Sequence, residues 1–254
     1  MKAMILAAGL GTRLRPLTDD RPKALVEVAG RTMLEITLTR LRDFGIQEVI
    51  VNVHHFAEMI DDYLKAKNNF GMRIEVSRED TLLDTGGGLK KAAWFFLEDS
   101  SLIKQPFVLH NVDVISTIDL RRMMQFHTEH QALATLAVQD RETSRYLVFD
   151  EQLQLCGRRA GRDGDPELIR SSPRTEALAF AGIHVISPRL LELMTEEGAF
   201  SIISAYLRLA AQAEKILAFR ADEYYWRDLG RPENVVPAEK DLKEVGRLEN
   251  RSPR

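Results

Sequence analysis

The chain has 254 residues, of which 44% are apolar and 29% charged, so it can fold into a large domain with a real core. Its 35 Lys and Arg against 38 Asp and Glu give a formal net charge of −3. That balance excludes a protein that binds nucleic acid through a basic excess. No apolar stretch approaches the length of about 20 residues that a membrane span needs, which argues against a membrane partner. The single Cys156 excludes an intramolecular disulfide and favours the reducing cytoplasm.

The first half of the chain alternates predicted strands and helices. An unbroken apolar run at residues 1–8 is typical of a strand buried on both faces of a sheet. A helix follows, because Thr32 and Glu35 have the spacing of a capping box and Gly45 stands where a C-cap would end it. The same alternation then predicts strands at 48–54, 73–79 and 106–113, and helices at 56–67, 89–98 and 119–130.

The second half has a different pattern. We expect a hairpin or meander, then a strand, two helices, two strands that finish the sheet and a closing helix, at 145–166, 179–187, 188–194, 201–213, 215–222, 224–230 and 232–245. Alternating strands and helices predict an α/β fold with a Rossmann-like, doubly wound, mostly parallel sheet. No Pro/Ser-rich linker divides the chain. We therefore expect one domain over residues 1–246, with halves at about 1–131 and 132–246, and a C-terminal tail at 247–254.

The stretch LAAGLGTRLRPLTDDRPKAL places a glycine turn and several cations directly after the first strand. Such a turn lies at the carboxyl edge of a parallel sheet, where open α/β folds bind their ligands. Gly9 and Gly11 allow successive N–H groups to face one anion. Arg13, Arg15 and Lys23 add positive charge that matches phosphate oxygens. The residues therefore indicate a cradle for a polyphosphate.

Other interpretations of this turn fit less well. A Walker-type loop ends in Gly-Lys-Ser/Thr, but here Gly11 is followed by Thr-Arg-Leu. A dinucleotide fingerprint needs a third glycine at the position of Leu14, and Pro16 follows soon after. A plain surface turn with solvated arginines would leave unexplained why two glycines, two arginines and a Pro-Lys pair stand so close together.

The longer stretch LAAGLGTRLRPLTDDRPKALVEVAG resembles the signature of the sugar-1-phosphate nucleotidylyltransferases, which carry Gly-x-Gly-Thr-Arg and then Pro-Lys at similar spacing. In that family, whose domain is a GT-A-like nucleotidyltransferase fold, a sugar 1-phosphate oxygen attacks the α-phosphorus of a nucleoside triphosphate and pyrophosphate leaves. The resemblance implies that Arg13 contacts the leaving pyrophosphate and that Lys23 bridges the reacting phosphates. It also implies a set of nucleotide-binding residues in and before the turn: Leu6, Ala8, Gly9, Gly11 and Thr12.

Two aspartates are candidate ligands of the Mg²⁺ that such a reaction calls for. Asp113 ends a predicted strand at the same sheet edge as the glycine turn, and Asp228 follows an aromatic, strand-like run. Each could instead cap a helix or loop. Both segments are similar to the metal-bearing motifs of the family, Asn-x-Asp and Trp-x-Asp-x-Gly-x-Pro, and this resemblance implies that both aspartates hold the metal. Val112 replaces the glycine that is usual between Asn and Asp.

Gly86 and Gly87 belong to a glycine run just ahead of a predicted helix. A flat base can approach such a main chain, whose N–H and C=O groups then read its edge, although a flexible entry to the helix would also explain the glycines. The segment is similar to the base-recognition loop of the family. Its Thr-Gly-Gly-Gly form looks closest to N-acetylmuramate 1-phosphate uridylyltransferases, while mannose and heptose 1-phosphate guanylyltransferases have related loops.

The segment FAGIHVISP resembles the strand that lies beside the sugar in the family, with Gly182 leaving room for the pyranose. By the same resemblance Asn111 and Glu176 are candidate sugar contacts. A Glu-Lys pair that holds the sugar and its phosphate in many relatives is missing. Arg158 or Arg159, in LCGRRAG, could replace its lysine.

Histidines do not indicate a zinc site. His54, His55 and His110 have no other His or Cys at ligand spacing, so packing at strand ends explains them better. Trp226 is interpreted as a wall of the site, since it lacks the basic neighbours of an RNA-stacking platform.

These motifs predict an enzyme of nucleotide-sugar biosynthesis whose partners are a nucleoside triphosphate and a sugar 1-phosphate. We expect UTP with an N-acetylmuramate- or N-acetylhexosamine-type 1-phosphate. Alternatives are GTP with mannose or heptose 1-phosphate, CTP with choline phosphate, and a non-catalytic nucleotide-sugar sensor. The presence of Arg13, Lys23, Asp113 and Asp228 together argues against the sensor. The sequence does not determine the oligomeric state.

Overall fold

The computed structural model describes residues 1–98 and 105–249, with side chains up to residue 242. Its strands are β1 (Lys2–Leu6), β2 (Glu27–Val28), β3 (Arg31–Thr32), β4 (Glu48–Val53), β5 (Arg73–Arg78), β6 (Phe107–Asn111), β7 (Val114–Ser116), β8 (Ala134–Gln139), β9 (Arg145–Asp150), β10 (Leu155–Ala160), β11 (Pro166–Leu168), β12 (Thr175–Ile186), β13 (Ile216–Arg220) and β14 (Trp226–Asp228). Its α-helices are α1 (Met33–Asp43), α2 (Ala57–Ala66), α3 (Asp84–Lys91), α4 (Ala93–Leu97), α5 (Leu120–Glu129), α6 (Arg189–Leu193), α7 (Ile202–Ala211) and α8 (Pro232–Glu249). Short 3₁₀ helices are η1 (Thr12–Leu14), η2 (Lys23–Leu25) and η3 (Asn68–Gly71).

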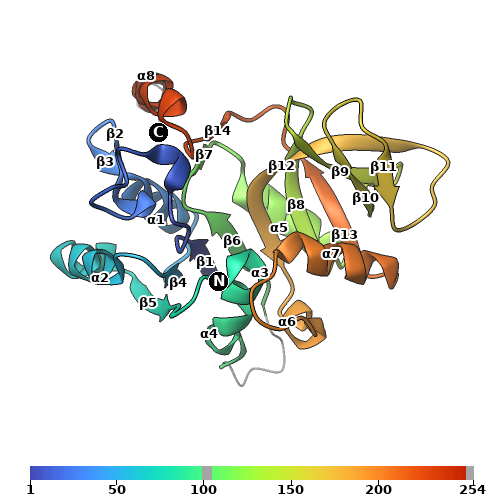
Figure 1. The fold of residues 1–254 in the computed structure, drawn as a ribbon, viewed down its shortest axis with the longest axis horizontal. Helices are drawn as coiled ribbons and strands as arrows, with labels where there is room; N and C mark the ends of the chain where they lie inside the picture. The colour runs from blue at the N-terminus through green and yellow to red at the C-terminus, as the bar shows by residue number, and fades with distance from the viewer. Residues whose placement is uncertain (99–104, 250–254) are drawn as a thin grey trace.

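One large sheet runs through the molecule in the order β11-β10-β9-β12-β6-β1-β4-β5, with β8 on β12 and β13 on β8. Strands β5, β4, β1 and β6 are parallel, as expected for strands joined by helical crossovers. The last residues of β12 pair antiparallel with β6, and its first residues pair antiparallel with β9. The meander then continues the sheet from β9 through β10 to β11. This arrangement confirms the predicted doubly wound α/β fold and locates its antiparallel part in the second half (Figure 1).

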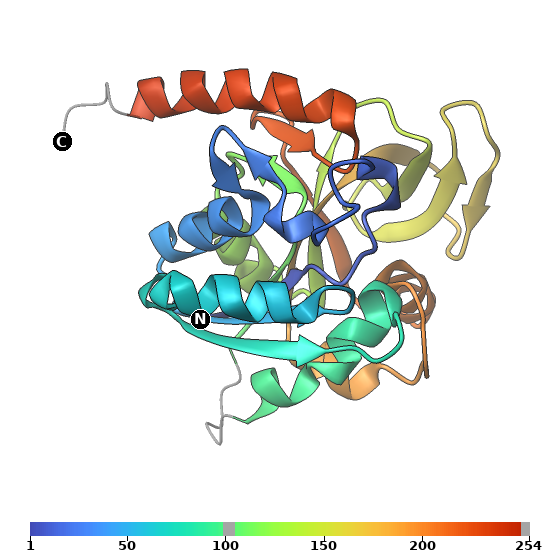
Figure 2. The ribbon, with the colours of Figure 1, turned by 60° about the vertical axis from the view of Figure 1, so that its left-hand side comes forward.

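The core consists of two apolar layers on opposite faces of the sheet, and β1 feeds both. Ala3 and Ile5 face the layer that contains the buried sides of α1, α2, α5 and α8. Met4 and Leu6 face the layer that contains α3, α4, α6 and α7. Because successive side chains of a strand point to opposite faces, the unbroken apolar run of β1 follows from burial on both sides. Figures 1 and 2 show α8 lying over the β2–β3 hairpin on the first layer.

The predicted caps of α1 are confirmed. The Thr32 hydroxyl accepts a hydrogen bond from the Glu35 N–H at 3.0 Å, which satisfies one of the free donors at the helix start. Gly45 adopts φ +84°, and its N–H donates to the Arg42 carbonyl at 2.8 Å.

Three local predictions are wrong. The helix expected at 89–98 begins at Asp84 and is divided at Ala92, because contacts with residues 198–200 hold the glycine run in helical form. β14 does not join the large sheet; it pairs with β7, which draws the two segments that end in aspartate together. α8 extends to Glu249 through mostly good helix formers, so residues 247–249 of the expected tail are helical, while 250–254 lie outside the described residues. In the part of the chain that the structure describes, no helix is long and apolar enough to cross a membrane.

The α3 glycines provide a test of this packing. A Cβ on Gly86 would lie 2.9 Å from the Phe200 carbonyl oxygen and closer still to the Phe200 ring, whereas a Cβ on Gly9 would meet only Lys23 Nζ at 3.7 Å. At a helix position with free space, replacing glycine by alanine stabilises the helix, so a fall in unfolding free energy would report the clash. We expect Gly86→Ala to lower the unfolding free energy by about 1–3 kcal/mol in urea titrations. The control Gly9→Ala should change it by less than about 0.5 kcal/mol, and equal stability of the two variants would contradict this packing.

Candidate active site

The glycine turn after β1 holds a conformation that glycine alone adopts easily. Gly11 has φ +67° and caps η1, and the Thr18 hydroxyl donates to its carbonyl at 2.8 Å. A Cβ on Gly11 would approach the Thr18 methyl to 2.9 Å and Lys23 Cβ to 3.3 Å. The turn is therefore closed by Thr18 and Lys23, and its backbone folds back over the end of β1.

The other residues predicted for the nucleotide lie along the same path. Leu6 is the last residue of β1, Ala8 is buried at the start of the turn, and Thr12 opens η1. Arg15 differs, because it is exposed and pairs with Asp19 on the surface at 3.4 Å. Arg13 is also exposed, but its guanidinium lies beside Gly230, so of the two arginines only Arg13 approaches the two aspartates.

Lys23 and Asp113 form a buried ion pair between two segments far apart in the chain. Lys23 begins η2, Asp113 follows β6, and Lys23 Nζ donates to Asp113 Oδ2 at 2.9 Å. Burial alone would raise the pKa of the Asp113 carboxyl. The charge and hydrogen bond of Lys23, helped by Arg13, outweigh that effect and hold the pKa below its ordinary value. Asp113 is therefore a carboxylate throughout the neutral range.

Asp228 is brought to the same point by the β7–β14 pair. In its register Asp228 lies opposite Val114, and the Leu229 N–H donates to the Asp113 carbonyl at 2.7 Å. A Cβ on Gly230 would lie 2.8 Å from Asp228 Oδ1, 3.0 Å from Arg13 Nη2 and 3.2 Å from Asp113 Oδ2. Because Gly230 has no side chain, the two carboxylates and the guanidinium surround a small space at the carboxyl edge of the sheet.

Histidines contribute no metal cluster to this region. Within the described ranges no three His, Cys, Asp or Glu side chains converge as a metal site. His54 bonds to the Glu79 carbonyl at 2.7 Å and His110 to the Asn111 carbonyl at 2.8 Å. Burial, helped by the charge of Arg40, lowers the pKa of His110 to about 4 and so keeps it neutral.

A buried polar network beside the turn was missed by the sequence analysis. The Asn52 carbonyl oxygen accepts from the Ala7 N–H at 2.7 Å, and its amide donates to Glu79 Oε1 at 2.8 Å. Glu79 Oε2 in turn accepts from the Leu83 N–H at 2.9 Å. One indication of this network was present in the sequence, because Asn52 and Glu79 are polar residues at the ends of two apolar strands. The network fixes the start of the glycine turn to β4, β5 and the entry of α3.

The N–H groups of Gly86 and Gly87 are engaged within the protein. Both N–H groups donate to the Phe200 carbonyl, at 2.9 and 3.3 Å. Both glycines are buried inside α3 and packed against residues 198–200. They allow α3 to pack closely against the chain that enters α7, and their part in reading a base stays a prediction.

A cavity of about 580 Å³ opens beside the two aspartates. Asn111, Gly182, Trp226 and Asp228 line it. Gly182 has φ +73°, and a Cβ there would meet the Asn111 amide at 2.8 Å, so these two predicted sugar residues touch. Trp226 donates through Nε1 to the Ala181 carbonyl at 2.8 Å and forms a wall, as expected.

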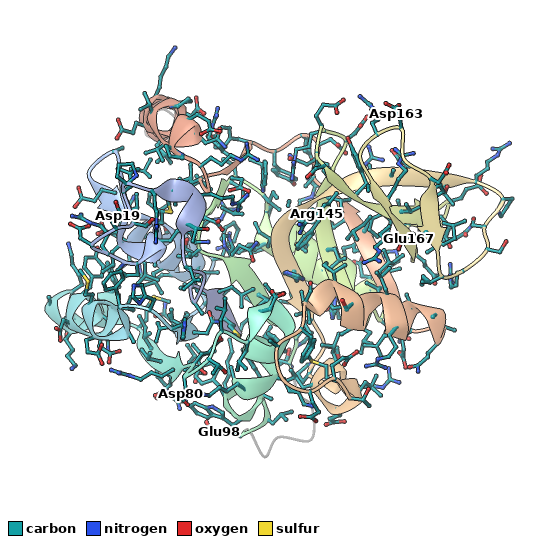
Figure 3. All side chains as sticks on the ribbon, viewed as in Figure 1. Asp19, Asp80, Glu98, Arg145, Asp163 and Glu167 are labelled. Atoms are coloured by element: carbon teal, nitrogen blue, oxygen red, sulfur yellow. The ribbon has the colours of Figure 1, made fainter. Side chains whose placement is uncertain are left out.

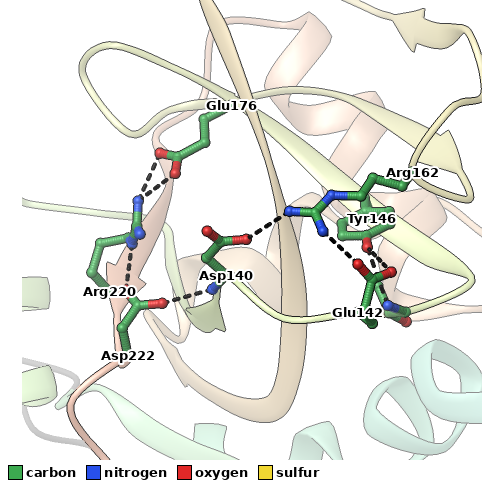
Figure 4. A network of polar contacts seen from close by, with 8 residues as sticks. Asp140, Glu142, Tyr146, Arg162, Glu176, Arg220 and Asp222 are labelled. Atoms are coloured by element: carbon green, nitrogen blue, oxygen red, sulfur yellow. Dashed lines mark hydrogen bonds and ion pairs between the residues drawn. The ribbon is translucent and has the colours of Figure 1, made fainter.

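Glu176 is the one predicted sugar contact that the structure places elsewhere. It lies near the start of β12, away from the cavity, and both its carboxylate oxygens accept from Arg220 at 2.7 Å (Figure 4). Glu176 and Gly182 lie on the same twelve-residue strand, with Glu176 near its start, and the role of Glu176 as a sugar contact stays a prediction.

Arginines dominate the far wall of the cavity. Arg158 and Arg159 line it, as proposed for the missing lysine, and so do Arg141 and Arg145, which the sequence analysis missed. The Arg141 guanidinium lies 3.6 Å from the centre of the Trp226 ring and donates to the Phe180 carbonyl at 2.8 Å. Burial lowers the pKa of Arg141, and the nearby Asp228 opposes that change.

Comparison with known proteins bears on this site. A family model described as nucleotidyl transferase matches residues 2–245. The N-acetylmuramate alpha-1-phosphate uridylyltransferase of Caulobacter vibrioides is 33% identical over 254 residues, which cover 96% of this chain and 97% of that protein. The probable mannose-1-phosphate guanylyltransferase 2 of Arabidopsis thaliana is 32% identical over 241 residues, which cover 93% of this chain but 63% of that protein.

Solved structures agree on the fold. HddC from Yersinia pseudotuberculosis, complexed with GMP-PN, matches with a TM-score of 0.73 and 23% identity over 95% of this chain and 99% of its own. A UDP-glucose pyrophosphorylase complexed with UDP-glucose matches with a TM-score of 0.76 and 17% identity over 96% of this chain and 98% of its own. These likenesses confirm the GT-A-like nucleotidyltransferase fold.

The buried ion pair has a measurable pH signature. Lys23→Met leaves the Asp113 carboxylate buried without its main partner, so we expect a loss of about 2–4 kcal/mol in unfolding free energy at pH 7. The lowered pKa of Asp113 contributes stability above the unfolded value of about 3.9, and that contribution is lost as the pH falls through the folded pKa. In the variant the pKa of Asp113 should rise.

The difference between the two proteins in urea unfolding should therefore be largest at neutral pH and narrow toward pH of about 4, where the variant's Asp113 is protonated. Arg15→Met, which removes an exposed pair, is the control and should cost less than about 0.5 kcal/mol. A Lys23→Met protein as stable as wild type at pH 7 would show that the pair does not hold this edge together.

Proposed function

This chain belongs to the nucleotidyl transferase family and is a sugar-1-phosphate nucleotidylyltransferase, and on that premise we propose that it joins UTP to an N-acetylmuramate- or N-acetylhexosamine-type 1-phosphate with Mg²⁺ in the cytoplasm. The observation that carries the proposal is the meeting of Arg13, Asp113 and Asp228 around Gly230, with Lys23 on Asp113. Since Asp228 also lines the cavity, the glycine turn and the proposed sugar site lie next to each other.

The two aspartates fit a divalent cation. Mg²⁺ in proteins is held by one or two carboxylates, and phosphate oxygens and water complete its shell. Asp113 and Asp228 come from neighbouring segments and face the space that a Cβ of Gly230 would fill. When bound, the ion would neutralise triphosphate charge and orient the reacting phosphates.

The chain's own residues account for the remaining steps by position and charge. Main-chain N–H groups of the turn at Gly9 and Gly11 face the triphosphate, and Lys23 exchanges its contact with Asp113 for the two reacting phosphates. Arg13 stabilises charge that develops on the departing pyrophosphate. A general base is not needed, because the attacking sugar phosphate is already a dianion near neutral pH.

The choice of UTP and of an amino-sugar phosphate is supported by the full-length likeness to the Caulobacter enzyme. A guanylyltransferase for mannose or heptose 1-phosphate is the second candidate. It is supported by the likeness to the Arabidopsis relative, although the match covers only 63% of that protein, and by the likeness to HddC with GMP-PN. A choline-phosphate cytidylyltransferase and a nucleotide-sugar sensor lack comparable support.

A crossed substrate panel tests this assignment. We expect pyrophosphate release to be fastest with UTP and N-acetylmuramate or N-acetylglucosamine 1-phosphate when four nucleoside triphosphates are crossed with those sugars, mannose 1-phosphate and choline phosphate. Removal of divalent metal by EDTA should abolish release, and Mg²⁺ should restore it. Faster release with GTP and mannose 1-phosphate would overturn the UTP assignment, whereas binding without turnover across the panel would favour the sensor.

The reaction centre can be tested with a matched arginine pair. Arg13→Ala and Asp113→Asn should each lower kcat by about 10²–10³, because each removes charge aimed at the reacting phosphates. Arg15→Ala should stay within about twofold of wild type, since Arg15 is exposed and pairs with Asp19. Circular dichroism should report an intact fold in all three proteins. Near-normal turnover of either of the first two variants would remove that residue from the reaction centre.

A further inference from the structure

The charged side chains that line the sugar cavity are four arginines and two acids: Arg141, Arg145, Arg158, Arg159, Glu167 and Asp228. Glu167 lies 2.7 Å from the guanidinium of Arg158. Figure 3 shows Arg145 near the middle of the molecule and Glu167 farther toward its right-hand side. The other three arginines form no ion pair with a carboxylate among residues 1–98 and 105–242, whose side chains the structure describes. One of these three, Arg141, packs against the strand that carries Asp228.

Arg141 lies in the loop between β8 and β9, and two contacts hold its guanidinium against the cavity wall. The guanidinium lies 3.6 Å from the centre of the Trp226 ring, and its Nη2 donates to the Phe180 carbonyl at 2.8 Å. Trp226 and Asp228 are two residues apart on β14, so their side chains point to the same side of that strand. Arg141 therefore lies beside Asp228, whose charge opposes the fall in the pKa of Arg141 that burial causes.

The acids that flank Arg141 in the chain do not neutralise it. Asp140 lies 3.8 Å from the guanidinium of Arg162, and Glu142 forms an ion pair with the same group (Figure 4). Only the main-chain carbonyl of Glu142 accepts from Arg141 Nη1, at 3.4 Å. A charge removed from water is costly unless an opposite charge accompanies it, so this arrangement favours an anionic ligand beside Arg141.

Most of the hydrogen-bonding capacity of Arg141 is unused. A guanidinium has five N–H bonds, and the described residues give a partner to only two of those in Arg141, through the carbonyls of Phe180 and Glu142. Its Nε is buried and has no hydrogen-bond partner among these residues. Arg141 also lines the cavity, so its remaining Nη–H groups are available to phosphate oxygens, which a guanidinium matches in geometry.

The other arginines of the cavity lie on its antiparallel strands. Arg145 is on β9, and Arg158 and Arg159 are on β10. Arg141, by contrast, contacts β14, the strand that ends in Asp228. Because Asp228 belongs to the proposed metal site, the phosphate of a sugar bound in the cavity has to lie at that end.

We propose that Arg141 binds the phosphate of the incoming sugar 1-phosphate, the part for which Arg158 and Arg159 were the candidates from sequence. The inference rests on the proposed function. In that reaction an oxygen of the sugar phosphate forms a bond to the α-phosphorus. The bond from that phosphorus to the bridging oxygen breaks, and its electron pair leaves with the pyrophosphate. Arg141 offsets the repulsion between the two phosphates as they meet.

Steady-state kinetics of Arg141→Met test this contact with the substrate pair that the crossed panel favours. Methionine keeps an apolar side chain against Trp226 but removes the charge. We expect kcat/KM for the sugar 1-phosphate to fall about 10–100-fold, as for the loss of a charge-assisted hydrogen bond, while the KM for the nucleoside triphosphate stays within about threefold. Arg141→Lys keeps the charge and should recover part of the loss. The control Arg189→Met removes a surface charge paired with Glu214 and should stay within about twofold of wild type.

Trp226 provides a readout that needs no turnover. The other tryptophan of the chain, Trp94, is exposed on α4, so Trp94→Phe leaves Trp226 as the only source of tryptophan fluorescence. In this background we would titrate the favoured sugar 1-phosphate, the same sugar without its phosphate, and inorganic phosphate. The α,β-methylene analogue of the triphosphate would be present with Mg²⁺. We expect the phosphorylated sugar to change the fluorescence at a concentration at least about tenfold lower than the free sugar, and Arg141→Met to remove that difference.

An equal rise in the KM of both substrates in Arg141→Met would show that Arg141 only supports Trp226, and would overturn the inference. A larger loss in Arg158→Met or Arg159→Met, or unchanged Trp226 titrations in Arg141→Met, would overturn it as well. In each of these cases pyrophosphate release by the wild-type protein would still uphold the proposed function. Absence of release with every sugar phosphate would instead defeat the proposed function, and the titration with inorganic phosphate would still decide whether Arg141 binds that group.

Discussion

The site depends on one electrostatic constraint, the buried contact between Lys23 and Asp113. A carboxylate at the end of β6 can be buried only if a cation accompanies it, and the glycine turn supplies that cation. The same contact places Lys23 where a triphosphate would compete for it. Two charges of the proposed reaction centre are thus paired with each other in the structure.

The two halves of the sheet have different tasks. Parallel strands β5, β4, β1 and β6 are packed between two apolar layers, and their ends hold the turn and Asp113. Antiparallel strands β9 and β10 carry arginines of the cavity wall, and β12 contributes its Phe180–Gly182 segment. β12 pairs directly with β6, so the wall is fixed to the same strand that positions Asp113. A site built on such paired strands loses little of its geometry to loop motion.

Short-range patterns explain which site residues could be found without a structure. Arg13 and Lys23 stand in a glycine turn directly after β1, and Asp113 follows a strand end, so their shared sheet edge was predictable. Asp228 needed the resemblance to a family motif. The Asn52–Glu79 contact had only a weak signal, because a single polar residue at a strand end has many structural explanations. The pairing of Glu176 with Arg220 had no signal in the sequence, because the two residues lie on strands far apart in the chain.

By itself the sequence determined the α/β class and the glycine turn with its cations at the edge of the sheet, since both follow from local periodicity, backbone freedom or charge within a few residues. Only the tertiary structure decided that β14 pairs with β7 and that the Phe200 carbonyl accepts from the N–H groups of the α3 glycines. It also decided that, among the described residues, three arginines of the cavity form no ion pair with a carboxylate. These features arise between segments distant in the chain. Their formation depends on which surfaces the packed sheet brings together, and local sequence patterns contain no record of that.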